Sequence, residues 1–240
     1  MPGSIAVLTD LGINGMKQWI SIRGKDRSNP ILFWLHGGPG FAQMSMPHYL
    51  DAELEEEYVV VHWDQRGAGK SNQSGFSEES MTIEQFKADT IVLINYLLEQ
   101  LVQEKIYLFG HSWGTQLGIE LVNEYPKKFH AYISESQVVN NARAVEIVTA
   151  WLQHAMKLNN DEKGLEQLAA LKNPAYDHSD YHELAQLAIS YGGNYDISFL
   201  QLALISFKAH EYTFLDYYRL LDGMNRGGRA HSPGRHYDTI

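Results

Sequence analysis

Four short apolar runs, separated by helical patterns, leave few folds open to the first 139 residues of this chain. The runs span residues 31–35, 58–63, 106–109 and 131–134. An apolar run that does not alternate with polar residues is typical of a strand covered on both faces, as strands are in a parallel sheet. Strands of this kind that alternate with helices predict a doubly wound α/β fold with a mostly parallel sheet.

Two helices are predicted between these runs. Thr82 and Gln85 have the spacing of a capping box and would open a helix over residues 83–103. A second helix should begin after Ser112 and end near Pro126, because proline does not continue a helix. Strand, helix and strand then follow one another as in other open α/β sheets.

The pattern changes at about residue 140, where the strand signal stops. Helical segments follow over residues 142–158, 161–172, 180–191 and 198–222. We therefore predict an α/β core over residues 1–139 and a helical lid over residues 140–222, at the carboxyl edge of the sheet where such folds bind ligands. Residues 223–240 contain several glycines and arginines, lack an apolar period and should form an irregular tail.

Composition excludes several kinds of site and partner. The chain has no cysteine, which excludes disulfides, thiolate catalysis and cysteine-based metal sites. Its formal net charge of −10 argues against nucleic acid and anionic membranes, both of which favour a basic face. No segment approaches the roughly 20 apolar residues of a membrane span, and the N-terminus lacks the basic part of a signal peptide. We expect a cytoplasmic protein without cofactor or metal.

The segment G-H-S-W-G at residues 110–114 matches the pattern G-x-S-x-G. It directly follows the apolar run at residues 106–109 and directly precedes a helical pattern, which is the context of a nucleophile elbow. Such a turn lifts a serine hydroxyl clear of the sheet and points the next backbone N–H toward an attacked carbonyl oxygen. Ser112 is therefore the predicted nucleophile, and the N–H of Trp113 is a predicted oxyanion donor.

A second glycine-rich segment, H-G-G-P-G at residues 36–40, directly follows the first apolar run. In a fold with a nucleophile elbow, the second oxyanion donor comes from the loop after an earlier strand. Glycines allow a backbone N–H to face the substrate, and Pro39 stiffens the loop. We expect the N–H of Gly38 to act together with that of Trp113.

These motifs, together with W-D-Q-R-G-A-G-K-S at residues 63–71, resemble the prolyl aminopeptidase (proline iminopeptidase) family of α/β-hydrolases in sequence, order and spacing. The resemblance covers about residues 17–139. It implies an α/β-hydrolase core with Ser112 as nucleophile and Gly38 and Trp113 as oxyanion donors. It also implies an enzyme that releases N-terminal residues, often proline, from peptides.

The resemblance implies roles for residues outside the elbow as well. In that family the lid carries carboxylates that bind the ammonium group of the substrate, and Glu211 is a loose match to that region. Asp64 and Arg66 would hold the loop after the second apolar run near the site. We expect these two residues to form a buried ion pair with each other.

Two catalytic groups have no predicted position. A serine triad of this fold runs in the order serine, acid, histidine, and the resemblance places acid and histidine each after a further strand. No such strand is predicted after residue 140, so the chain looks truncated and its last core strands are missing. Three functions stay open for a small peptide or ester substrate: an aminopeptidase acting by acyl transfer, a general carboxylesterase, and a truncated inactive product.

Overall fold

The computed structural model describes residues 3–46, 51–172, 178–193, 209 and 212–230. These residues fall into two compact units. The first unit contains residues 3–138 together with residues 209 and 212–230, and the second contains residues 139–193.

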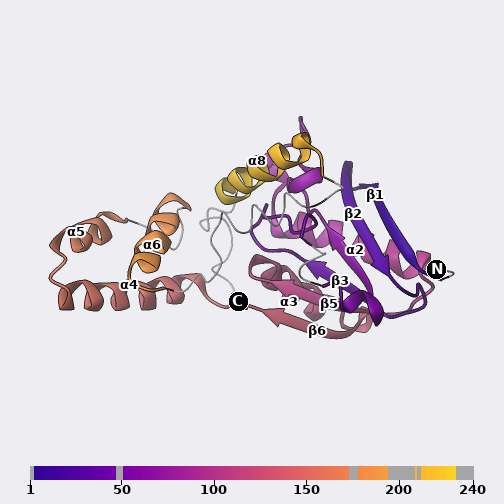
Figure 1. Cartoon of the computed structure of the whole chain (residues 1–240), viewed down its shortest axis with the longest axis horizontal. Coiled ribbons are helices and arrows are strands. Elements are labelled where there is room, and N and C mark those ends of the chain that lie inside the picture. Colours follow the sequence, from indigo (N-terminus) through magenta and orange to yellow (C-terminus); the bar gives the residue numbers. More distant parts are fainter. Residues whose placement is uncertain (1–2, 47–50, 173–177, 194–208, 210–211, 231–240) are drawn as a thin grey trace. The chain divides into compact units, whose positions relative to one another are not determined.

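A six-stranded sheet forms the centre of the first unit (Figure 1). Its strands are β1 (Ile5–Ile13), β2 (Met16–Gly24), β3 (Ile31–Leu35), β4 (Val59–Trp63), β5 (Ile106–His111) and β6 (Phe129–Glu135). Their spatial order is β1-β2-β4-β3-β5-β6. β3 pairs in parallel with β4 and β5, and β5 pairs in parallel with β6, whereas β2 is antiparallel to both β1 and β4. The predicted α/β fold with a mostly parallel sheet is confirmed.

All four apolar runs form strands, but the sequence interpretation missed the N-terminal hairpin of β1 and β2. Neither strand is a continuous apolar run. Thr9 and Asp10 interrupt β1, and Lys17 and Gln18 interrupt β2. Asn14 and Gly15 both adopt positive φ and join Ile13 to Met16 across a two-residue turn. The Asn-Gly pair is the signal that could have revealed the hairpin.

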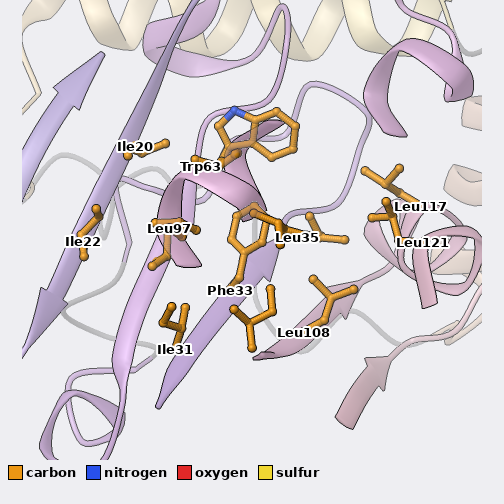
Figure 2. Close-up of a cluster of buried hydrophobic side chains, with 14 of the residues drawn as sticks. Ile20, Ile22, Ile31, Phe33, Leu35, Trp63, Leu97, Leu108, Leu117 and Leu121 are labelled. Carbon is orange, nitrogen blue, oxygen red and sulfur yellow. The ribbon is translucent and has the colours of Figure 1, made fainter. Parts of the chain in front are cut away.

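Helices α2 (Ile83–Gln100) and α3 (Trp113–Glu124) pack their apolar side chains against the same face of the sheet. Figure 2 shows part of this core, with side chains from β2, β3, β4, β5 and both helices. Thr82 caps α2 as predicted, since its hydroxyl accepts the N–H of Gln85 at 3.2 Å. The Gln85 amide does not complete the capping box but donates to Asp89.

The second unit contains three helices among its described residues: α4 (Asn141–Leu158), α5 (Glu162–Ala170) and α6 (His178–Ser190). They pack around a small core of their own, which includes Leu152, Met156 and Leu168. These helices confirm the helical prediction for the three segments between residues 142 and 191. Their role as a lid stays a prediction.

Helix α8 (Phe214–Ala230) differs from the sequence prediction at both of its ends. Ala209, Tyr212 and Thr213 are not helical, although the predicted helix spanned residues 198–222. The predicted irregular tail is wrong for residues 223–230, which continue the helix.

Contacts with the loop after β4 attach α8 to the rest of the first unit. The Asn72 amide donates to the carbonyl of Arg219 and to the carboxylate of Asp222, each at 3.0 Å. A Cβ atom on Gly223 would lie 2.7 Å from the carbonyl oxygen of Gly67, so glycine permits this close approach. Tertiary contacts thus outweigh the helix penalty of glycine, which is about 1 kcal/mol per residue. α8 belongs to the unit of the sheet, which places the domain boundary elsewhere than the predicted residue 222.

Short 3-10 turns complete the described structure at Leu54–Glu56 (η1), Gly69–Ser71 (η2), Glu78–Ser80 (η3) and Pro126–Lys128 (η4). η4 begins where the predicted proline stop ends α3. Among the described residues, no helix combines the length and the apolar character that a bilayer span requires.

Candidate active site

Ser112 lies at the junction of β5 and α3 in a strained backbone conformation. Its φ of 51° and ψ of −120° fall outside the regions that L-residues ordinarily occupy. Such a conformation costs on the order of 1–3 kcal/mol and persists only where the surroundings enforce it. Here the Ser112 N–H donates to the carbonyl of Glu135 at 3.0 Å, and the Ser112 carbonyl accepts from the backbone and hydroxyl of Thr115. The turn is thus held from both sides.

The glycines of the G-x-S-x-G motif allow α3 to begin directly against the sheet. A Cβ atom on Gly114 would lie 2.9 Å from the carbonyl oxygen of His36 and closer still to that of Leu35. A Cβ atom on Gly110 would lie 2.8 Å from the carbonyl oxygen of Gly114. Backbone atoms cannot move aside as a flexible side chain can. Larger residues would therefore push the helix away from the carboxyl end of β3.

The glycine-rich loop at residues 36–40 lies against the elbow, as the sequence analysis requires. A Cβ atom on Gly37 would lie 3.2 Å from the Cβ atom of Ser112. Gly38 has a φ of +119°, and a Cβ atom there would lie 2.6 Å from the backbone nitrogens of Gly40 and Phe41. Only glycine suits this position. The sequence motifs at residues 36–40 and 110–114 therefore meet at one edge of the sheet.

Two backbone N–H groups at this edge are the predicted oxyanion donors. Trp113 is the first residue of α3, where the helix dipole favours negative charge. Gly38 supplies a second N–H from the facing loop. A hydroxyl beside two main-chain donors is the arrangement that acyl transfer requires. The roles of Ser112, Gly38 and Trp113 stay predictions.

The His36 ring has a structural role beneath the glycine-rich loop. Its Nε2 accepts the backbone N–H of Gln65 at 3.1 Å, so the ring proton is on Nδ1, which donates to the Gly37 carbonyl at 2.7 Å. Burial lowers the pKa of His36 to about 4, although the hydrogen bond to Gly37 acts in the opposite direction. His36 is therefore neutral near pH 7, and both ring nitrogens are occupied.

Gln65 connects all three sequence motifs, a role that the sequence analysis did not predict. Its side-chain amide donates to the carbonyl of His36 at 3.2 Å. Its side-chain oxygen accepts the indole N–H of Trp113 at 3.4 Å. The side chain is fully buried.

The predicted ion pair between Asp64 and Arg66 is wrong. Arg66 donates instead to both carboxylate oxygens of Asp89 on α2, from Nε at 2.9 Å and from Nη2 at 3.1 Å. Asp89 also accepts from the buried amide of Gln18 at 2.7 Å. The guanidinium thus forms a bidentate pair with a carboxylate that α2 holds on its buried face.

Asp64 joins the loop at residues 64–72 to the segment that precedes α8. Its Oδ2 accepts the backbone N–H of Lys70 at 2.7 Å and the hydroxyl of Tyr212 at 2.9 Å. Burial raises the pKa of Asp64 to about 7, against the lowering effect of these two hydrogen bonds. Lys70 in turn pairs with Asp216 of α8 at 2.7 Å and lies over the ring of Tyr212. These residues attach α8 to the core.

The remaining predicted groups are not part of the described site. Glu211, predicted to bind the ammonium group of the substrate, lies outside the described residues. The three histidines nearest in sequence to the motifs each have a hydrogen-bond partner: His36 as above, His62 the buried carboxylate of Asp51, and His111 the amide of Gln43, at 3.4 Å from Nδ1. Within the described parts of the chain, no three metal-ligating side chains cluster together.

Comparisons with known proteins agree with this geometry. The chain is 42% identical over 160 residues to the probable aminopeptidase YbaC of Bacillus subtilis, covering 67% of this chain and 49% of that protein. It is 37% identical over 106 residues to a proline iminopeptidase of Arabidopsis thaliana, covering 44% of this chain and 26% of that protein. Epoxide hydrolases match as well, among them epoxide hydrolase 4 of Mus musculus, at 33% identity over 103 residues, 42% of this chain and 26% of that protein.

A solved structure supports the same fold. The proline iminopeptidase of Mycobacterium smegmatis superposes with a TM-score of 0.53 at 20% identity, covering 94% of this chain and 70% of that protein. The chain spans about half the length of the Bacillus subtilis relative, and less of the other two. The family model described as the alpha/beta hydrolase fold matches residues 30–173, which is more than half of the chain. The chain is therefore a member of the α/β-hydrolase fold family, with aminopeptidases and proline iminopeptidases among its relatives.

Proposed function

We propose that this chain carries the nucleophile of a serine hydrolase that releases N-terminal residues from peptides by acyl transfer. Ser112 is the nucleophile, and the backbone N–H groups of Gly38 and Trp113 form the oxyanion hole. The proposal depends on one observation: the strained turn at Ser112 lies so close to the glycine-rich loop that a Cβ atom on Gly37 would lie 3.2 Å from the Cβ atom of Ser112.

The chemistry follows from these groups. The Ser112 hydroxyl attacks a substrate carbonyl as a general base takes its proton, and the new oxyanion accepts from the two amides. As the intermediate collapses, the base returns this proton to the leaving amine or alcohol, which departs and leaves an acyl ester on Ser112. Water then cleaves the ester and releases the acid. We expect the histidine base and its carboxylate partner to lie outside the groups described above, because His36 and His62 are buried and hydrogen-bonded elsewhere.

The residue at the elbow favours acyl transfer over epoxide opening. A hydroxyl that opened an epoxide would become an alkyl ether, which water does not readily cleave, so the enzyme would stop after one turnover. Acyl transfer to the same hydroxyl gives an ester, which water hydrolyses. The name of the Bacillus subtilis relative supports an aminopeptidase within this class. A general carboxylesterase is the alternative, because both use the same nucleophile and oxyanion donors.

Labelling with a fluorophosphonate probe tests the nucleophile. We expect the folded chain to react at Ser112, as located by peptide mass spectrometry, and Ser112→Ala to lose the label. Ser136→Ala is the matched control, because Ser136 is an exposed serine that also has positive φ, at 53°. It should label like the wild type. A folded wild-type chain that does not react would contradict the proposal and favour a truncated inactive product.

Substrate choice separates the two hydrolase classes. An aminopeptidase should cleave proline 2-naphthylamide, whereas an esterase should cleave only a short acyl ester such as p-nitrophenyl acetate. Both activities should be measured against Ser112→Ala, which removes background hydrolysis from the comparison. Cleavage of the ester alone would leave Ser112 as nucleophile and remove the peptidase assignment.

A further inference from the structure

We infer that Gln65 is a positioning residue that sets the orientation of the two oxyanion donors. This inference rests on the proposed roles of Gly38 and Trp113. Its basis is that one buried side chain bonds to both arms of the proposed oxyanion hole, from a loop that belongs to neither.

The first contact orients the glycine-rich loop. The side-chain amide of Gln65 donates to the His36 carbonyl, and its backbone N–H holds the His36 ring in the tautomer that donates to the Gly37 carbonyl. In a planar trans peptide, the carbonyl and the following N–H point in opposite directions. Because the Gly37 carbonyl faces the His36 ring, the N–H of Gly38 faces away from that ring, as an oxyanion donor must.

The second contact orients the start of α3. The indole N–H of Trp113 donates to the side-chain oxygen of Gln65, and the Trp113 side chain is buried. Trp113 supplies the other proposed donor from its backbone, at the first position of the helix. The hydrogen bond from the indole to Gln65 restrains the Trp113 side chain. The backbone N–H of the same residue is the proposed donor to the oxyanion.

A primary amide has both groups that this position uses, at any pH. One planar, fully buried group must donate to a carbonyl and accept from an indole at the same time. A carboxylate would lose the donor and an aliphatic side chain would lose both groups. Gln65 thus couples the loop at residues 36–40 to α3 through a directional contact.

The test compares two buried glutamines that each accept from a tryptophan indole. Gln65→Leu removes both side-chain hydrogen bonds. Gln18→Leu is the matched control, since Gln18 accepts from Trp63 at 3.0 Å and donates to Asp89, away from the proposed donors. The measurement is the fluorophosphonate reaction of Ser112, resolved into the binding constant and the maximal rate of inactivation.

We expect Gln65→Leu to lower the maximal rate about 10- to 100-fold with little change in the binding constant, because misplaced donors weaken the transition state. Gln18→Leu should stay within about threefold of wild type. Equal rate losses in the two variants would overturn the inference and make Gln65 a merely structural residue.

A second variant covers the case in which Gln65→Leu does not fold. Gln65→Glu keeps the shape and the acceptor, and its carboxyl group donates only while protonated. Its rate relative to wild type should therefore fall as the pH rises and the new carboxyl ionises. A measurable ratio that does not change with pH would contradict the inference.

NMR resonances distinguish failure of the inference from failure of the proposed function. An unreactive wild-type chain would contradict the proposed function alone. In that case 15N NMR tests the role of Gln65 without any reaction, through the backbone amide resonance of Gly38 and the side-chain indole resonance of Trp113. Both should shift in Gln65→Leu and stay in place in Gln18→Leu. Unmoved resonances in Gln65→Leu would overturn the inference.

Discussion

His36 shows how a residue that resembles a catalytic group can serve the backbone instead. Its ring is buried, neutral and hydrogen-bonded at both nitrogens. A protonated ring would carry a hydrogen on Nε2, facing the N–H of Gln65, and would lose the acceptor that holds the loop. Folding therefore disfavours the protonated form of the His36 ring.

This exclusion predicts a pH-dependent stability. The pKa of His36 is lowered from 6.5 to about 4, so between these values the unfolded chain binds a proton that the folded chain does not. Stability must then fall as the pH drops from about 6.5 to 4. The full effect on the free energy of unfolding is on the order of 3 kcal/mol. The free energy of unfolding should be measured in urea at several pH values. Its decrease between pH 6.5 and 4 should be smaller in His36→Asn by the contribution of His36.

The exposed His154 on α4 provides the control. His154→Asn should retain the slope of the wild type. Equal slopes in wild type and His36→Asn would contradict a depressed pKa for His36.

At the scale of residues, motifs with a local cause were predictable and long-range partners were not. The elbow and the glycine-rich loop depend on close backbone approach, which the spacing of glycines reports. The partner of Arg66 depends on the tertiary fold. One signal was present, however: Asp89 lies on the apolar stripe of α2, between Phe86 and Leu93. A carboxylate on a buried face needs a cation, and that requirement points to an arginine elsewhere in the chain.

Among the elements, α8 is attached to the core by buried polar contacts. Lys70 and Asp216 form an ion pair with side chains only 7% exposed, and Asp216 also accepts from Thr213. Burial alone would raise the pKa of Asp216, but the hydrogen bonds from Lys70 and Thr213 outweigh burial and lower it. The charged form of Asp216 is thus the one that α8 uses.

Removing Lys70 should release α8 without unfolding the sheet. Lys70→Met removes the buried cation beside Asp216 and leaves only the partly exposed guanidinium of Arg219 at 3.4 Å, which costs on the order of 3 kcal/mol. Hydrogen exchange of the α8 amides should accelerate roughly 100-fold, whereas exchange in β3 and β5 should change little. Mass spectrometry of peptic fragments resolves the two regions.

Lys87→Met is the matched control, because Lys87 pairs with Glu120 and Glu124 while its side chain stays 23% exposed. Partly exposed pairs contribute at most about 1 kcal/mol, so exchange in α8 should be unchanged. Uniform acceleration across the whole first unit in Lys70→Met would contradict a local role.

Element boundaries agreed with the sequence where a strong local signal, such as an apolar run or a helix cap, was present. The continuous apolar runs became strands, and Thr82 began α2 as its side chain indicated. α8 could not be predicted in the same way, since the glycines and the missing apolar period argued against a helix over residues 223–230. α8 packs against residues 67–72, about 150 positions earlier in the chain, and a local pattern contains no information on such a partner.

For the whole molecule, the two units each have a hydrophobic core and should lose stability separately. Leu97 of α2 and Leu152 of α4 are both fully buried, one in each core. Each Leu→Ala change should cost about 2–5 kcal/mol. Leu152→Ala should therefore speed amide exchange in α4, α5 and α6 by at least about 30-fold and leave β3 and β5 unchanged.

Leu97→Ala should produce the reverse pattern, and the double variant should combine the two effects additively. Strong acceleration of β3 in Leu152→Ala would show instead that the two units unfold as one. The sequence predicted the change of character near residue 139, but not the return of residues 209 and 212–230 to the first unit, because that return depends on contacts distant in sequence.

The loop after β4 combines polarity with burial in an unusual way. Its buried polar side chains are those of Asp64, Gln65, Arg66, Lys70, Ser71 and Asn72. Hydrocarbon side chains attract one another from any direction, so an apolar core tolerates many alternative packings. Hydrogen bonds weaken steeply when their angles deviate, and a network of them tolerates few. The edge of the sheet that carries Ser112 therefore packs against a polar network. The directional hydrogen bonds of this network restrict the conformations of the neighbouring backbone.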